Sequence, residues 1–273
     1  METSRRIPTV LGQINVRLSG LEQGPAMVCW PSLLMDGRMW RAQAAHFGDR
    51  YRMVLVDSPG HGDSEPLTRN FSMEECALCL RQILDALEQP HCVLLGNSWG
   101  GMMGGVFAGL HRDRIRAAVL MNCTASAVGW RQKLEFLALS AIVSRLRRIP
   151  GPLVQRAVAA FAGETTERSK PQVVEQIRST VLAANPQSVH WAIRSVVPLR
   201  VDRHAQMAAI RCPVLVIAGE EDRTFPVAET KAMADAIPGS RFLVLPKVGH
   251  LAALEAPEQI NAAIADFLSG LPA

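Results

Sequence analysis

The chain has 273 residues, of which 48% are hydrophobic and 20% are charged. This composition supports a large buried core and argues against intrinsic disorder, and the length suits one α/β domain with an insertion. The formal net charge is only +4, without a basic stripe interleaved with aromatic residues, so nothing indicates a nucleic-acid-binding protein. The two arginines near the start are not followed by an apolar stretch, so we expect no secretory signal.

Short apolar runs alternate with longer segments of helical periodicity, which predicts a parallel sheet with helices on both faces. In chain order, the predicted strands are residues 13–18, 26–30, 52–57, 92–97, 117–122, 213–219 and 241–246. Most of them are continuous apolar runs, as expected for strands that are covered on both sides. The predicted helices are residues 39–47, 73–87, 99–110, 228–237 and 257–268.

One apolar stretch is long enough to imitate a membrane helix, because no Asp, Glu, Lys or Arg stands between Gln89 and Arg112. Six glycines interrupt it and it opens at Pro90, so a strand, a tight turn and a buried helix explain it better. We therefore expect no membrane span.

The alternation stops after the strand at 117–122. Residues 126–203 contain helical patterns but no convincing strand, and such a segment is too long for an ordinary connection. Five prolines divide it into about four short helices: Pro150, Pro152, Pro171, Pro186 and Pro198. We predict that residues 126–203 form an inserted helical cap, or lid, and that residues 1–125 and 204–273 form the core.

Cysteine usage does not indicate a metal or redox centre. Cys76 and Cys79 form a C-x-x-C pair, but neither a second pair nor nearby histidines accompany it. Several other cysteines lie in apolar runs, where free cysteine behaves as a small hydrophobic residue. We expect a reduced, cytoplasmic protein.

The most informative motif is G-x-S-x-G, formed by Gly96, Ser98 and Gly100 between a predicted strand and a predicted helix. In this context a strained turn lifts the serine hydroxyl above the sheet edge, where it can act as a nucleophile. Larger side chains at the two glycines would collide with the neighbouring strand and helix. The helix start at Trp99 also aims backbone N–H groups at the site, which favours a developing oxyanion.

Further segments resemble characteristic loops of the α/β-hydrolase fold superfamily, and the closest likeness is to its enol-lactonase and small carboxylesterase branch. They are DSPGHGDS (57–64), VLMNCTAS (119–126), GEEDRTFP (219–226) and VGHLAALEAPEQI (248–260). The resemblance implies an α/β-hydrolase fold, which is a mostly parallel, doubly wound sheet with an inserted helical cap. It also implies a triad of Ser98, Asp222 and His250, in that chain order.

Chemistry supports these roles. A serine hydroxyl is a weak nucleophile and needs a base, and histidine titrates near neutrality. His250 lies in a loop just past a C-terminal apolar strand, whereas His61 is a rival by motif only. Asp222 would hold the imidazole in the correct tautomer, with Glu220 and Glu221 as adjacent competitors.

The resemblance also implies an oxyanion hole made by the backbone N–H groups of Leu33 and Trp99. Here the sequence departs from the family, because Pro31 and Ser32 replace the usual His-Gly pair. Proline has no N–H and cannot donate. Backbone donors do not depend on side-chain identity, so Leu33 can still serve.

Together these features predict a serine hydrolase that cleaves a carboxylic ester or lactone through an acyl-enzyme, without a metal or organic cofactor. A carbon–carbon bond hydrolase, and a perhydrolase or cofactor-free haloperoxidase, are alternatives with the same triad. A catalytically silent relative that binds a small ligand is an alternative of another class. The expected partner is a small-molecule ester or lactone and not a nucleic acid. The physiological substrate, and the choice between monomer and homodimer, stay open.

The cap is expected to pack one apolar face over Ser98, through the runs FLALSAIV (136–143) and VQRAVAAFA (154–162). Trp130 and Trp191 are candidate substrate-binding residues in the pocket wall. The segment 126–203 holds twelve Lys and Arg against five Asp and Glu, a net charge of +7. We hypothesise that one or two arginines face inward and hold a substrate carboxylate, because arginine matches that group bidentately.

Overall fold

A computed structural model describes residues 2–271 of the chain. It contains one eight-stranded sheet with the strand order β1-β2-β4-β3-β5-β6-β7-β8. The strands are β1 (Thr3–Thr9), β2 (Gly12–Gly20), β3 (Ala26–Trp30), β4 (Arg52–Val56), β5 (Cys92–Asn97), β6 (Ile115–Met121), β7 (Val214–Gly219) and β8 (Arg241–Leu245). β2 runs antiparallel to both β1 and β4, and the pairs from β4 to β8 are parallel. The predicted mostly parallel sheet is confirmed.

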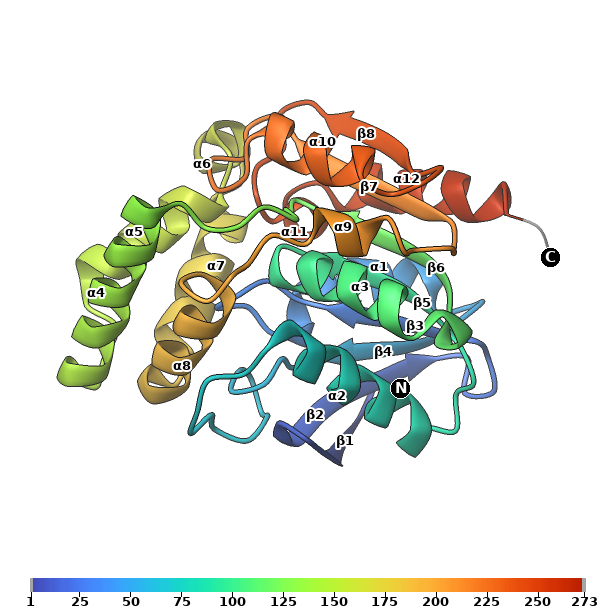
Figure 1. The fold of residues 1–273 in the computed structure, drawn as a ribbon, viewed down its shortest axis with the longest axis horizontal. Coiled ribbons are helices and arrows are strands. Elements are labelled where there is room, and N and C mark those ends of the chain that lie inside the picture. Colours follow the sequence, from blue (N-terminus) through green and yellow to red (C-terminus); the bar gives the residue numbers. More distant parts are fainter. Residues whose placement is uncertain (1, 272–273) are drawn as a thin grey trace.

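Helices cover both faces of this sheet (Figure 1). Outside the segment 126–203 they are η1 (Gly37–Trp40), α1 (Arg41–Phe47), α2 (Met73–Ala86), α3 (Trp99–Leu110), η2 (Arg112–Arg114), α9 (His204–Met207), α10 (Val227–Asp235), α11 (Ala252–Glu255) and α12 (Pro257–Ser269). Strand residues divide between two cores by their alternation. Val28 packs in the core that contains α2 and α3, whereas its neighbours Met27 and Cys29 pack in the core that contains α1 and α12.

All seven predicted strands are present, and β1 is the addition. Its sequence, TSRRIPT, is polar and mostly exposed, and the strand pairs with β2 alone at the sheet edge. The predicted helix 39–47 begins as the 3₁₀ turn η1 and continues as α1. The apolar stretch after Gln89 consists of β5 and the buried helix α3. Within residues 2–271 we find no helix with the length and apolar character that a membrane crossing needs.

Residues 126–203 are helical apart from their connections. The helices are α4 (Trp130–Leu146), α5 (Gly151–Phe161), α6 (Glu164–Ser169), α7 (Pro171–Ala183) and α8 (Pro186–Val196). Prolines open α7 and α8 and stand at the start of α5, as the sequence predicts. The short helix α6 makes five helices instead of about four. Helices α4, α5, α7 and α8 lie together at one end of the sheet (Figure 1).

Candidate active site

The G-x-S-x-G motif forms the turn between β5 and α3. Ser98 has a φ of 55° and a ψ of −111°, a conformation that a non-glycine residue adopts only under strain. Its N–H donates to the Met121 carbonyl on β6 at 2.8 Å, which fixes the turn against the sheet. A Cβ atom on Gly96 would overlap the backbone of Gly100, and one on Gly100 would overlap the Trp30 carbonyl on β3. Both glycines are therefore required by close backbone packing.

His250 and Asp222 form a buried pair at the ends of neighbouring strands. Asp222 follows β7 and His250 follows β8, and the imidazole Nδ1 lies 2.9 and 3.0 Å from the two carboxylate oxygens. The same carboxylate accepts the N–H groups of Thr224 and Phe225 at 2.8 and 3.0 Å, which orients it. Because a carboxylate accepts from Nδ1–H, the basic nitrogen is Nε2.

His250 and Ser98 line the same cavity. Nε2 is buried and makes no hydrogen bond within residues 2–271, so it is not yet hydrogen-bonded to the Ser98 hydroxyl. Serine–histidine contacts are often this loose before substrate binds. The rings of Phe161 and Phe225 both pack near the imidazole, with centroid distances of 5.5 and 5.7 Å.

The rival acids and the rival histidine lie elsewhere. Glu221 accepts the N–H and the hydroxyl of Thr165, at 2.7 and 2.6 Å, and so joins the acid loop to α6. Glu220 is exposed and accepts the Lys247 N–H at 3.3 Å. His61 contacts the loop after β3 instead of Asp222. The geometry therefore pairs His250 with Asp222 alone among these carboxylates.

Two asparagines that the sequence analysis did not single out hold the histidine loop. Asn97 and Asn122 both donate to the backbone carbonyl of His250, at 2.8 and 2.7 Å. Asn122 also donates to the Gly249 carbonyl and accepts the Gly219 N–H, each at 2.8 Å. Both side chains are fully buried. The signal for these residues in the sequence was their position, because each asparagine is a polar residue at the end of an apolar strand.

Glu255 is a third residue that the sequence analysis missed. Its buried carboxylate accepts three N–H groups, from Gly163 at 2.8 Å, Leu251 at 2.9 Å and Gly249 at 3.2 Å. These contacts tie the histidine loop to the start of α6 in the inserted segment. Burial raises the pKa of the Glu255 carboxyl above its usual range, although the backbone hydrogen bonds oppose this effect.

The loop after β3 contributes Leu33 to the wall of the same cavity. Within the described chain, neither its N–H nor that of Trp99 has a hydrogen-bond partner. The next amide, of Leu34, is different because it donates to His61 Nε2 at 3.1 Å. Leu34 has a φ of 66°, so the loop turns sharply there.

His61 also contacts the second predicted donor residue. Its ring lies 5.6 Å from the Trp99 ring in an edge-on arrangement. Nδ1 of His61 lies 3.0 Å from the Pro59 carbonyl, to which it donates when Nε2 accepts from Leu34. Burial lowers the pKa of His61 below its usual value of 6.5, which keeps the ring neutral and Nε2 an acceptor.

The cavity that contains Ser98 and His250 has a volume of about 150 Å³ and mostly apolar walls. Helices α4, α5 and α8 contribute Phe136, Leu153 and Ile193 among others, so the inserted segment covers the site as predicted. The division of the chain into core and cap domains at 126 and 203 stays a prediction.

Trp130 and Trp191, the predicted substrate-binding residues, are not among the residues that line this cavity, and their role in binding stays a prediction. Trp130 is the first residue of α4, and its side chain is 68% exposed beside Arg131. Trp191 packs against the core from α8, with its ring 4.7 Å from that of His190. Smaller apolar side chains from the same helices line the cavity.

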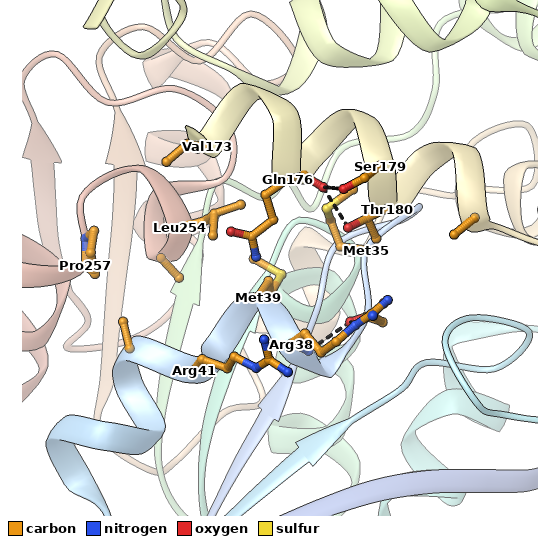
Figure 2. Close-up of a pocket in the computed structure, with 14 residues that line it drawn as sticks. Met35, Arg38, Met39, Arg41, Val173, Gln176, Ser179, Thr180, Leu254 and Pro257 are labelled. Carbon is orange, nitrogen blue, oxygen red and sulfur yellow. Dashed lines mark hydrogen bonds and ion pairs between the residues drawn. The ribbon is translucent and has the colours of Figure 1, made fainter. Parts of the chain in front are cut away.

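A larger cavity of about 530 Å³ lies outside the site, between α7 and the segment from Met35 to Ala42. Figure 2 shows Gln176 pointing from α7 toward Met39, with Arg38 and Arg41 at the opposite edge. Arg38 is paired with Asp36 at 2.5 Å. Neither Ser98 nor His250 lines this cavity, so the candidate active site is the smaller one.

The cysteines take no part in either cavity. All six are free, and burial raises the pKa of the Cys79 thiol to about 12. Across residues 2–271, no group of three or more His, Cys, Asp or Glu side chains is arranged to hold a metal ion.

A strained serine after a central strand, with a carboxylate–imidazole pair after two later strands, defines a hydrolase-type site on an α/β sheet. The chain matches the family with the alpha/beta hydrolase fold over residues 25–257, and it belongs to that family. This confirms the resemblance found in the sequence.

Similar proteins include enzymes that act on esters and lactones. The chain is 24% identical to 3-oxoadipate enol-lactonase 2 of Acinetobacter baylyi, over 92% of this chain and 91% of that protein. It is 25% identical to the pimeloyl-[acyl-carrier protein] methyl ester esterase of Nitrosospira multiformis, over 94% and 99%. Among solved structures, a thermophilic esterase from Thermogutta terrifontis is 30% identical, with a TM-score of 0.89 over 98% of both chains. The chain is therefore a hydrolase with esterase and lactonase relatives.

Proposed function

We propose that this protein hydrolyses a carboxylic ester or lactone through an acyl-enzyme on Ser98. The observation that carries the proposal is the cavity that Ser98 and His250 share. In the His250 imidazole, Nδ1 is held by Asp222 and Nε2 makes no hydrogen bond within the described chain. This arrangement provides a nucleophile, a base and an orienting acid in the roles that acyl transfer needs.

In the proposed reaction, the Ser98 hydroxyl attacks the carbonyl carbon while His250 Nε2 takes its proton. Asp222 stabilises the imidazolium that forms. The tetrahedral intermediate collapses, His250 returns the proton to the leaving alcohol oxygen, and an acyl-enzyme remains. His250 then takes a proton from water, which attacks the acyl carbon, and the acid leaves as Ser98 regains its proton.

The negative oxygen of the tetrahedral intermediate would be bound by the backbone N–H groups of Leu33 and Trp99. Both amides lack protein partners in the described part of the chain, as donors reserved for a substrate should. His61 would act as a positioning residue, because it holds the neighbouring Leu34 amide. The Leu33 amide, one residue earlier in the loop, stays free to donate.

The named activities of the relatives support ester or lactone hydrolysis as the first choice. Both curated relatives described above are hydrolases of a lactone or an ester. The mostly apolar walls of the cavity suit a small organic ester or lactone. Carbon–carbon bond cleavage and perhydrolysis use the same triad, and nothing in this cavity favours them.

The test is labelling with a fluorophosphonate, which reacts with an activated serine. We expect labelling at Ser98, loss of labelling in Ser98→Ala, and loss of ester hydrolysis by several orders of magnitude in that variant. A folded wild-type protein that neither reacts with the probe nor hydrolyses short aryl esters and lactones would be a catalytically silent, ligand-binding relative. Labelling at another serine would contradict the assignment of the nucleophile.

A further inference from the structure

The cavity around Ser98 contains two charged side chains besides the titratable His250, and both are arginines. Arg156 comes from α5 and Arg200 from the connection after α8. Most of the other lining side chains are aliphatic or aromatic, with Gln132 and Thr224 as polar exceptions. The two arginines are therefore the groups that could recognise a charge on a bound molecule.

The two arginines differ in what they already bind. Arg156 is half exposed and forms an ion pair with Glu135 of α4. Arg200 forms no ion pair with a carboxylate within 4.0 Å in residues 2–271. Its Nε donates to the Ser126 carbonyl at 3.0 Å, and its two terminal nitrogens make no hydrogen bond within the described chain.

Arg200 is also held in a relatively dry position. Its guanidinium carbon lies 5.3 Å from the centroid of the Phe225 ring, a contact that orients a cation over an aromatic face. Burial lowers the pKa of Arg200, and Glu229 opposes this effect without forming an ion pair. An arginine stays protonated in proteins, so this part of the cavity carries a positive charge without a close counter-ion.

Arg200 and His250 contact the same aromatic side chain, Phe225. Phe225 lies beside both groups, 5.3 Å from the Arg200 guanidinium and 5.7 Å from the His250 ring centroid. The guanidinium is therefore no farther from the imidazole than the sum of these two distances. Ser98, His250 and Arg200 all line the same cavity, so one bound molecule can contact Ser98 and Arg200 together.

We propose that Arg200 binds a carboxylate of the substrate, so that the preferred substrates are short esters or lactones that carry a second, ionised carboxyl group. This proposal rests on the proposed function and assigns its substrate class. The two free terminal nitrogens match the two oxygens of a carboxylate. An anion bound there also supplies the missing counter-charge to a cation in an apolar wall.

Arg200 has a second accessible side that the test must separate. With Met102 it also lines another cavity of about 250 Å³, beside Phe71 and Arg203. An anion that reached Arg200 from this outer cavity would not compete with a substrate at Ser98. Competition with substrate therefore distinguishes the two sides.

The experiment compares kcat/KM for ethyl pentanoate and for monoethyl glutarate, whose carboxylate lies at the far end of a similar chain. We expect Arg200→Met to lower kcat/KM for the monoester about 10- to 100-fold more than for the neutral ester, mainly through KM, because the lost contact is a charge-assisted hydrogen bond. Arg200→Lys keeps the charge but not the paired geometry. Its kcat/KM for the monoester should therefore lie between the values of wild type and Arg200→Met. The matched control is Arg156→Met, which removes the arginine that Glu135 already neutralises and should shift the ratio less.

Binding of free glutarate, measured by calorimetry, tests the same contact without catalysis. We expect wild-type protein to bind glutarate more tightly than Arg200→Met does, and glutarate to inhibit ester hydrolysis competitively. Equal losses for both esters in Arg200→Met, or non-competitive inhibition, would overturn the proposal and leave the hydrolase function intact. If the wild type hydrolyses neither ester, fluorophosphonate labelling decides the proposed function, and the calorimetric difference still decides the role of Arg200.

Discussion

The contact between His61 and the loop after β3 gives the sharpest test of the proposed oxyanion hole. His61 Nε2 accepts the Leu34 N–H at 3.1 Å, and its Nδ1 reaches the Pro59 carbonyl at 3.0 Å. His61→Leu keeps a buried side chain of similar bulk but removes both hydrogen-bonding atoms. His61→Gln can place an oxygen near the position of Nε2 and so keeps an acceptor for Leu34.

The expected losses follow from these contacts. Each buried backbone group left without a partner costs about 1–3 kcal/mol, so His61→Leu should destabilise the fold by about 2–6 kcal/mol. If the loop moves so that Leu33 no longer reaches the oxyanion, the loss is that of one donor, about 10²–10³ in kcat. Because Leu33 itself is unchanged, this range is an upper bound. The kcat of His61→Gln should fall by less than about tenfold, since only the hydrogen bond to the Pro59 carbonyl disappears.

The assay measures kcat and KM separately with a short aryl ester, alongside urea unfolding to show that each variant is folded. A donor that acts on the transition state lowers kcat and changes KM little. If folded His61→Leu keeps a kcat within about threefold of wild type, His61 stabilises the turn without positioning the hole. Equal losses in the two variants would also refute the argument, because the acceptor at Leu34 would then be irrelevant.

The strands were predictable because a strand covered on both faces has little choice of residue. β3, β5 and β7 are buried along their whole length and appear in the sequence as uninterrupted apolar runs. β1 gave no such signal, because an edge strand pairs on one side only and tolerates polar residues and Pro8. The inserted segment was predicted as helical from its periodicity, but the short helix α6 was not resolved from its neighbours.

Residues of the site were predictable where one local turn defines them. Ser98, Asp222 and His250 each follow a strand in a loop of characteristic sequence, so their places could be assigned one at a time. The supporting contacts join distant parts of the chain, such as Asn122 to His250 and Glu255 to Gly163. No local pattern encodes such partners, because they depend on how the loops pack.

Helical periodicity also left the orientation of the inserted helices undetermined. It could not tell that Trp130 points to solvent while Phe136, on the same helix, faces the cavity. Composition likewise gave a net charge of +7 for this segment without indicating which arginine faces inward. The packing of the folded chain distinguishes the two cavity arginines. Arg156 forms an ion pair with Glu135, whereas Arg200 has no carboxylate partner within the described chain.

Three further predictions test the histidine and its supports. Asp222→Asn should lower kcat by about 10⁴, on the precedent of serine proteases, whereas Glu221→Gln should change it little; exchanged phenotypes would move the acid to Glu221. Asn122→Ala leaves the Gly219 N–H without its acceptor and removes one donor to His250, so urea unfolding should show a loss of about 2–4 kcal/mol, and a loss near zero would refute that role. Glu255 should make stability depend on pH. The pKa of Glu255 is raised in the folded protein above the ordinary 4.5. Its contribution to the free energy of unfolding is therefore fully present below pH 4.5, and it falls as the pH rises through the pKa of the folded state. The free energy of unfolding of wild type minus that of Glu255→Gln, measured by urea unfolding, should therefore decrease from pH 4.5 toward about pH 7, because glutamine does not titrate. A difference that grows with pH would show that the three backbone N–H groups outweigh burial and stabilise the ionised carboxylate instead.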